Sequence, residues 1–283
     1  MFLAVDIGNT RITFGVFDEH GQLQKKWDES SLKESSLYSS RGNAGIFACS
    51  DSAPRALAQG RALRCELAAK IPASLLMNSR IGLASVVPDL TPSVVDFFKS
   101  KYPGISLTEI SVELNTGLEF CVENSKEIGA DRIANCTYAF NKYRSVNSPG
   151  MAGRSLLIID MGTAITFDCV TSKGEYLGGL IYPGIETSFK NLFEKAARLQ
   201  PIHLEKPHNL VGKNTRQHVQ SGYYYGTKSL MNGLINEYKR ELGDLFVIAT
   251  GGHSHLLLTD PLFNFDVVDP DLTLKGIHFL CAK

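Results

Sequence analysis

Near its N-terminus the chain reads Leu3-Ala4-Val5-Asp6-Ile7-Gly8-Asn9-Thr10-Arg11-Ile12-Thr13-Phe14. With one residue deleted, the same stretch returns as Leu157-Ile158-Ile159-Asp160-Met161-Gly162-Thr163-Ala164-Ile165-Thr166-Phe167. In this alignment Asp6 corresponds to Asp160 and Gly8 to Gly162, and four further residues match after the gap. Each copy predicts a buried strand, a tight polar turn and a second strand. The repeat therefore predicts two related halves, each with a carboxylate, a glycine and a hydroxyl at a hairpin turn.

The repeated turn has the residue types of a site for phosphate and a metal ion. Glycine lets backbone N–H groups approach an anion closely. A neighbouring aspartate can hold a cation, or a water molecule on that cation. The alternative is a hairpin used twice in which each aspartate only caps its turn. The second copy with its matched residues favours the phosphate and metal site.

The composition excludes several classes of protein. The length of 283 residues suits two domains or one large one, and 43% hydrophobic with 20% charged residues is typical of a globular protein with a core. Lys+Arg and Asp+Glu both number 29, so the basic surplus of a nucleic-acid binder is missing. The N-terminus lacks the basic segment of a signal peptide, and no apolar stretch reaches the length of a membrane helix. We expect a cytoplasmic protein that binds neither nucleic acid nor membrane.

The cysteine and histidine residues do not indicate a metal centre. The six cysteines form no CxxC pair and lie among apolar or small residues, so we expect reduced, mostly buried thiols. The pair His253 and His255 has no partner at ligand spacing and follows two glycines, which favours a loop.

The hydrophobic pattern predicts strands followed by helices, twice over. The expected strands are a hairpin and a third strand within 1–27, then 46–49, 81–87, a second hairpin from 155 that returns over 175–177, and 245–249. The expected helices are 54–70, 91–101, 126–144, 186–199 and 216–242, with loops at 28–45 and 145–154. This order predicts an α/β protein of two similar lobes, 1–120 and 121–283.

Two such lobes, each with a phosphate turn, resemble the actin-like ATPase and sugar-kinase superfamily. Its ribonuclease-H-like lobes hold ATP in the cleft between them. Within this superfamily the chain resembles the type III pantothenate kinases. The matching motifs are Asp6-Ile7-Gly8-Asn9-Thr10, Ser85-Val86-Val87-Pro88, Gly129-Ala130-Asp131-Arg132, Asp160-Met161-Gly162-Thr163-Ala164, Gly174-Glu175-Tyr176-Leu177-Gly178-Gly179, Pro183-Gly184-Ile185, Gly212-Lys213-Asn214-Thr215, Thr250-Gly251-Gly252 and Pro270-Asp271-Leu272-Thr273-Leu274. Residues 28–80 match only loosely.

The resemblance implies an ATP site made from both turns. The phosphate-binding residues would be Asp6, Ile7, Gly8, Asn9, Thr10, Arg11, Ile12 and Thr13 in the first lobe and Thr163 in the second. Thr250, Gly251 and Gly252 would border the adenosine, where bare backbone can approach it. An ordinary turn before a helix is the alternative for these last three residues.

The resemblance also implies a substrate site. The block Gly129, Ala130, Asp131 and Arg132 would bind pantothenate, with Asp131 as the base that accepts or orients the attacking hydroxyl. Arg132 suits the substrate's carboxylate because its guanidinium is a planar fork. Thr215 would contact the substrate, and a helix N-cap is a compatible alternative. For Asp131 the alternative is an exposed helical aspartate paired with Arg132 or a lysine.

The implied cations are a monovalent ion, K⁺ or NH₄⁺, at Asp160 and Mg²⁺ at Asp6. The residue types do not separate the two roles.

One departure from the family is Lys126, which stands where the family often has a tyrosine beside the substrate. Lys126 is either an anion contact or a solvated lysine.

The function implied by the resemblance is ATP-dependent phosphorylation of pantothenate, the first step of coenzyme A synthesis, by a homodimer. One alternative is a kinase of another small hydroxy acid or a sugar, because the fold hosts many substrates. Another is a catalytically weak regulatory accessory protein of the same fold. The retained polar residues, Asp131 and Arg132 among them, argue against a protein that has lost activity. The length leaves no room for the extra subdomains of a filament former.

Overall fold

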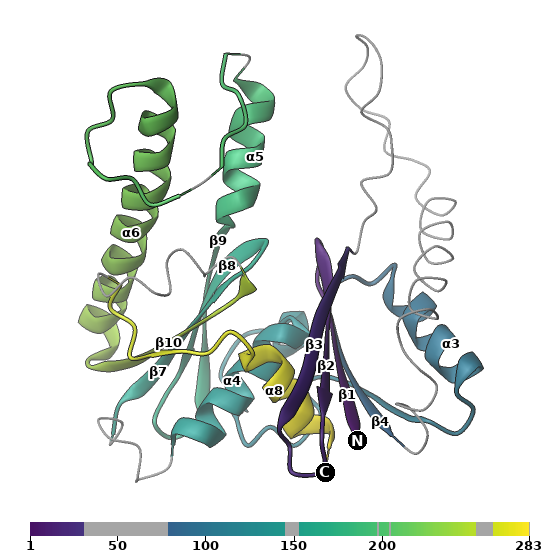
Figure 1. Cartoon of the computed structure of the whole chain (residues 1–283). Helices are drawn as coiled ribbons and strands as arrows, with labels where there is room; N and C mark the ends of the chain where they lie inside the picture. The colour runs from purple at the N-terminus through teal and green to yellow at the C-terminus, as the bar shows by residue number, and fades with distance from the viewer. Residues whose placement is uncertain (31–78, 145–152, 197, 204, 253–262, 283) are drawn as a thin grey trace. The chain divides into compact units, whose positions relative to one another are not determined.

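The computed structural model describes residues 1–30, 79–144, 153–196, 198–203, 205–252 and 263–282 (Figure 1). The contacts divide the chain into two compact units. Unit 1 comprises Met1–Leu114, Gly129–Asp131 and Ile277–Lys283, and unit 2 comprises Asn115–Ile128 and Arg132–Gly276. The expected strand 46–49 and helix 54–70 lie outside the described residues, as do most of the loop 28–45 and the loop 145–154. The lobe boundary at residue 120 stays a prediction.

Unit 1 is built on a sheet of five strands in the order β3-β2-β1-β4-β5. The strands are β1 (Phe2–Ile7), β2 (Arg11–Phe17), β3 (Leu23–Ser30), β4 (Arg80–Ser85) and β5 (Ser106–Glu109). β1 is antiparallel to β2 and parallel to β4. Alternate residues of β1, such as Val5, pack with Val94 and Phe98 of helix α3 (Thr91–Lys101) in one core. The expected hairpin, third strand and helix 91–101 are confirmed.

Unit 2 repeats this strand order and adds one strand. Its sheet runs β11-β10-β7-β8-β9-β6, so β9-β8-β7-β10-β11 corresponds to β3-β2-β1-β4-β5. The strands are β6 (Glu119–Phe120), β7 (Ser155–Met161), β8 (Ala164–Val170), β9 (Glu175–Pro183), β10 (Leu245–Thr250) and β11 (Val267–Val268). As in unit 1, the first strand of the hairpin is antiparallel to the second and parallel to a later strand. The internal repeat therefore reflects two sheets with the same topology.

Helices cover both faces of the unit 2 sheet. Leu157 and Ile159 of β7 pack with α5 (Ile185–Lys195) and α6 (Thr215–Leu242). The alternate residues Leu156 and Ile158 pack with α4 (Ala130–Tyr143) and α8 (Leu272–Cys281). Side chains alternate along a strand, so Asp160 belongs to the α4 face. The sheet therefore directs a charged residue of β7 towards α4.

Two of the predicted helices have different ends. The expected helix 126–144 begins only at Ala130, because a short 3-10 turn over Ser125–Glu127 is followed by Ile128 in an extended conformation. The helix expected over 186–199 ends at Lys195. The hydrophobic pattern does not predict these helix ends, because local backbone geometry sets them.

The return strand of the second hairpin was expected over 175–177, ending before the glycine pair Gly178-Gly179, and that end is wrong. β9 continues to Pro183, with a register shift between Cys169 and Val170 of β8 and a positive φ of 91° at Gly178. A Cβ atom on Gly179 would collide with the carbonyl of Phe167 in β8. The glycines therefore allow a bulge and a close strand contact.

Helix α8 was not predicted. It packs against α4 at a glycine, Gly276. A Cβ atom on Gly276 would collide with the backbone carbonyl of Ala134. The two helices thus approach so closely at this point that Gly276 cannot carry a side chain. Among the described residues, no helix combines the length and the apolarity needed to cross a bilayer.

The described cysteines differ sharply in exposure, and this predicts their reactivity. Cys136, Cys169 and Cys281 are buried, whereas Cys121 is exposed. Burial raises the pKa of Cys169 and of Cys281 to about 12. A thiol with a raised pKa forms less of the reactive thiolate at any given pH.

We therefore expect iodoacetamide to modify Cys121 in the folded protein, faster as the pH rises. The three buried thiols should react only after unfolding. Peptide mass mapping of native and guanidinium-unfolded samples measures this difference. Rapid native modification of Cys169 would contradict the packing of β8.

Candidate functional site

The first turn joins β1 to β2 in unit 1. Asp6 lies opposite Thr13 in the hairpin, and the N–H of Gly8 donates to the carbonyl of Arg11 at 3.0 Å to close the turn. Asn9 and Thr10 at the tip are exposed. The turn therefore presents an amide and a hydroxyl side chain beyond a rigid hydrogen-bonded base.

The second turn joins β7 to β8 in unit 2 and is built in the same way. Asp160 lies opposite Thr166, and the N–H of Gly162 donates to the carbonyl of Ala164 at 3.0 Å. Thr163 at the tip is exposed. One residue fewer separates the paired strands, as the deletion in the sequence repeat predicts.

Two glycines pack their backbones against the second turn. The N–H of Gly184 donates to the carbonyl of Thr163 at 3.0 Å, and a Cβ atom on Gly184 would collide with that oxygen. Gly251 has a φ of 105°, and its Cβ atom would lie 2.5 Å from the carbonyl oxygen of Met161. Thr250, the preceding residue, is buried and pairs with Asp160 across β10 and β7. The turn, Thr250 and Gly251 are therefore brought together, with Gly252 next along the chain.

Asp131 lies at the start of α4 and folds back on Gly129. A Cβ atom on Gly129 would lie 2.5 Å from Oδ1 of Asp131 and 3.2 Å from Cγ1 of Val86. The N–H of Val86 donates to the carbonyl of Ile7 at 3.1 Å. All of these residues belong to unit 1. The carboxylate of Asp131 is thus packed beside a segment that is bonded to the end of β1, the strand of Asp6.

Arg132 forms a buried ion pair that the sequence pattern did not predict. Its Nη2 donates to Oδ1 of Asp168 at 2.6 Å, and its Nε donates to Oδ1 and Oδ2 at 3.0 and 3.2 Å. The hydroxyl of Tyr176 donates to the same Oδ1 at 2.7 Å. Burial alone would lower the pKa of Arg132, but the hydrogen bond and charge of Asp168 raise it, so the guanidinium stays charged. A carboxylate inside the apolar run of β8 was the signal that could have revealed this pair.

Asp160 is bonded to α4 through Asn135. The Nδ2 of Asn135 donates to Oδ2 of Asp160 at 2.9 Å, which fixes the orientation of the amide because only its NH₂ end can face a carboxylate. Within the described residues, the Oδ1 of Asn135 and the Oγ1 of Thr166 are buried without a hydrogen-bond partner. Oxygen atoms left over beside a carboxylate suit a cation that takes oxygen ligands. No group of three or more His, Cys, Asp or Glu residues in the described part of the chain forms another candidate metal site.

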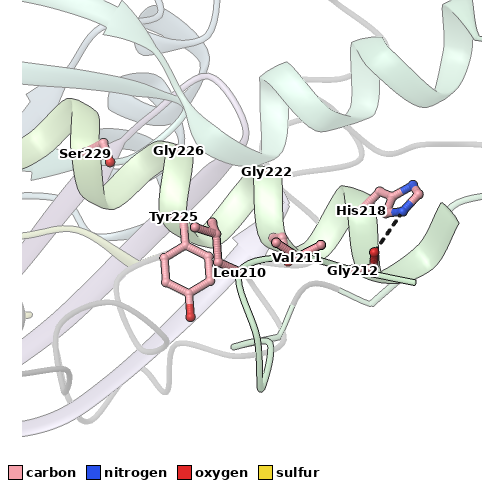
Figure 2. Close-up of a pocket in the computed structure, with 9 residues that line it drawn as sticks. Leu210, Val211, Gly212, His218, Gly222, Tyr225, Gly226 and Ser229 are labelled. Atoms are coloured by element: carbon pink, nitrogen blue, oxygen red, sulfur yellow. Dashed lines mark hydrogen bonds between the residues drawn. The ribbon is translucent and has the colours of Figure 1, made fainter. Parts of the chain in front are cut away.

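Thr215 begins α6, but it does not cap the helix. The cap is Asn214, whose Oδ1 accepts from the N–H of Gln217 at 2.9 Å. Close by, a groove of about 520 Å³ lies between the preceding loop and α6 (Figure 2). It is lined by Leu210, Val211, Gly212, His218, Ser221, Gly222, Tyr225, Gly226 and Ser229.

Lys126 is exposed on the 3-10 turn before α4, and its contact with a substrate stays a prediction.

Known proteins resemble this chain in sequence and in fold. A family model described as type III pantothenate kinase matches residues 2–237. The type III pantothenate kinase of Desulforapulum autotrophicum is 33% identical over 286 residues, covering 100% of this chain and 97% of that protein. Among solved structures, a Baf family transcriptional activator from Campylobacter jejuni has a TM-score of 0.55 at 18% identity, covering 98% of this chain and 96% of the other. A ROK family glucokinase from Streptomyces griseus has a TM-score of 0.50 at 12% identity, covering 99% of both chains. The structural likenesses concern the fold, and they confirm an α/β protein of two ribonuclease-H-like lobes.

The backbone packing at Gly251 leads to a stability prediction. Gly251→Ala should cost about 1–2 kcal/mol for the left-handed backbone and about 1–3 kcal/mol more for the collision with Met161. Gly104→Ala is the matched control, since Gly104 has a φ of 86° and nothing within 4 Å of its Cβ position. Thermal melting of both variants measures the difference. Equal losses would mean that Gly251 is needed only for its backbone conformation.

Proposed function

The chain belongs to the type III pantothenate kinase family, and we propose how its residues carry out that family's reaction. The reaction is ATP-dependent phosphorylation of pantothenate in the first step of coenzyme A synthesis. It transfers the γ-phosphoryl group of ATP to a hydroxyl oxygen of the substrate. The proposal is supported by the two hairpin turns. Each turn is closed by an equivalent hydrogen bond from its glycine, and each places an aspartate opposite a threonine.

We assign the phosphates of ATP to the first turn. Phosphoryl transfer passes through a loose transition state, so catalysis depends on donors and cations placed around the phosphate oxygens. Asn9 and Thr10 are exposed at the tip, and Gly8 leaves room for close approach to the backbone. Asp6 is the residue for Mg²⁺, which neutralises phosphate charge when it is bound.

The second turn supplies further contacts to the nucleotide. Thr163 is exposed at its tip in the same position as Thr10 of the first copy. Gly251 and Gly252 follow β10 and offer backbone without side chains to the adenosine. The bonded environment of Thr163, with Gly184 and Gly251 packed against the turn, supports a rigid contact.

Asp131 is assigned to the attacking hydroxyl of pantothenate. A loose transition state needs little deprotonation, so orientation of the hydroxyl contributes more than basicity. The packing of its carboxylate over Gly129 supports a fixed position. Arg132 is assigned to the substrate's carboxylate, and Thr215, exposed at the start of α6, to a further substrate contact.

We assign a monovalent cation, K⁺ or NH₄⁺, to Asp160. The residues present fit such an ion, because Asn135 and Thr166 each leave a buried oxygen without a partner in the described structure. A large monovalent ion takes carboxylate, amide and hydroxyl oxygens and offsets negative charge when it is bound. Two further assignments complete the proposal. A homodimer is proposed from the family resemblance, and a cytoplasmic protein that binds neither nucleic acid nor membrane is proposed from the composition and charge of the sequence.

The first test concerns Asp131. Asp131→Asn should lower kcat by about 10²-fold while the KM for ATP stays unchanged, because the residue acts on the hydroxyl in the transition state. Gly129→Ala should lower kcat by about 10-fold, since the new Cβ atom displaces the carboxylate. Steady-state phosphate transfer to pantothenate measures both effects.

Gly233→Ala is the matched control, because Gly233 is an exposed glycine of α6 with nothing within 4 Å of its Cβ position. It should keep the kcat of the original protein. A near-normal kcat in Asp131→Asn would show that Asp131 is only a surface charge.

The second test concerns the cation. Activity should require K⁺ or NH₄⁺, with Na⁺ a poor substitute, and Asp160→Ala should abolish the response to K⁺. Asn135→Leu, which removes the amide but keeps the size of the side chain, should weaken it. Stabilisation by K⁺ in thermal melting gives a readout that is independent of activity. Full activity in a buffer with Na⁺ as the only monovalent cation would refute the assignment of Asp160.

A further inference from the structure

Asp168 is a buried charge that the reaction as assigned above does not use. It lies on β8, its side chain is 2% exposed, and it pairs with Arg132, whose side chain is 15% exposed. Burying two charges is costly, and such a pair contributes less to stability than a hydrophobic replacement of similar size often does. Stability alone therefore does not explain why Asp168 lies beside Arg132, the residue proposed to contact the carboxylate of the substrate.

The bonds to Asp168 fix the guanidinium of Arg132 in one orientation. Nε and Nη2 both donate to Asp168, so one edge of the fork is held by the protein. A substrate carboxylate must then meet a different edge of the guanidinium. An arginine held in this way loses little rotamer freedom when it binds a carboxylate, which is the advantage of preorganisation.

Tyr176 fixes Asp168 in turn. Its hydroxyl donates to Oδ1, and burial together with the charge of Asp168 raises its pKa, so it remains a donor at neutral pH. The bulge between β8 and β9 pairs Val170 with Tyr176 but Cys169 with Gly178, which leaves Leu177 as the extra residue. Bulges commonly redirect a side chain in this way.

We propose that Asp168, supported by Tyr176, is a positioning residue that orients Arg132 for the carboxylate of pantothenate and thereby sets the preference for an acidic substrate. This inference rests on the proposed role of Arg132. It predicts that Asp168 affects discrimination between charged and neutral substrates rather than phosphoryl transfer itself.

The experiment compares pantothenate with pantothenol, in which a primary alcohol replaces the carboxylate. The original protein should prefer pantothenate by about 10- to 100-fold in kcat/KM, the range for a hydrogen bond to a charged group. Asp168→Asn should raise the KM for pantothenate by about 10-fold or more and abolish most of that preference. Its kcat, its KM for ATP and its kcat/KM for pantothenol should change by less than about 3-fold.

Two further variants separate the inference from the role on which it rests. Arg132→Gln should also lose the preference. If it does while Asp168→Asn keeps the preference, the positioning inference is wrong and the role of Arg132 stands. If Arg132→Gln keeps the preference, Arg132 does not bind the carboxylate, and both claims fail.

Asp269→Asn is the matched control for loss of an ion pair. Asp269 is nearly buried in unit 2 and accepts from Nζ of Lys275 at 2.7 Å. It should keep the preference for pantothenate. If Asp168→Asn lowers kcat/KM equally for pantothenate and for pantothenol, Asp168 has only a structural role and the proposal is overturned.

Tyr176→Phe decides the matter if Asp168→Asn does not fold. It keeps the ion pair and removes one hydrogen bond, so the preference should fall by about 3-fold or more. A folded Tyr176→Phe with an unchanged preference would overturn the supporting role of Tyr176 and, with it, the proposal.

Discussion

Contact between bare backbones at the turn after β7 is the constraint on which the second unit depends. Gly184 and Gly251 approach the backbone of Met161 and Thr163 so closely that neither can carry a side chain. The end of β9 and the end of β10 are therefore held at fixed places around one turn. Because backbone rather than side-chain packing sets these distances, Thr163, Thr250 and Asp160 are placed with little freedom.

The face of α4 that packs on the sheet makes a second set of contacts, which are polar. Arg132 and Asn135 are three residues apart, so they lie on the same side of the helix, and they contact Asp168 and Asp160 on neighbouring strands. One helix thus presents Asp131 at its start and binds two buried or half-buried carboxylates along its side. Within unit 2, α4 therefore contacts both the partner of Arg132, which is assigned to the substrate, and Asp160, which is assigned to the cation.

Much of this arrangement could be predicted because it is local. The repeat around Asp6 and Asp160 identified both hairpins, and hydrophobic spacing identified α3 and α6. The pair of Arg132 and Asp168 was not predictable from local pattern, because 36 residues separate the partners and only the folded sheet brings them together. The glycine pair in β9 misled the prediction for a related reason, since its effect depends on how closely β8 approaches.

Every residue role proposed for this chain depends on one activity, the transfer of a phosphoryl group from ATP to pantothenate. The most direct measurement incubates the purified protein with ATP, Mg²⁺ and K⁺ and either pantothenate or glucose, and identifies the products by mass spectrometry. We expect 4′-phosphopantothenate and no glucose phosphate. Equal phosphorylation of glucose, or no product from pantothenate with both cations present, would refute this activity.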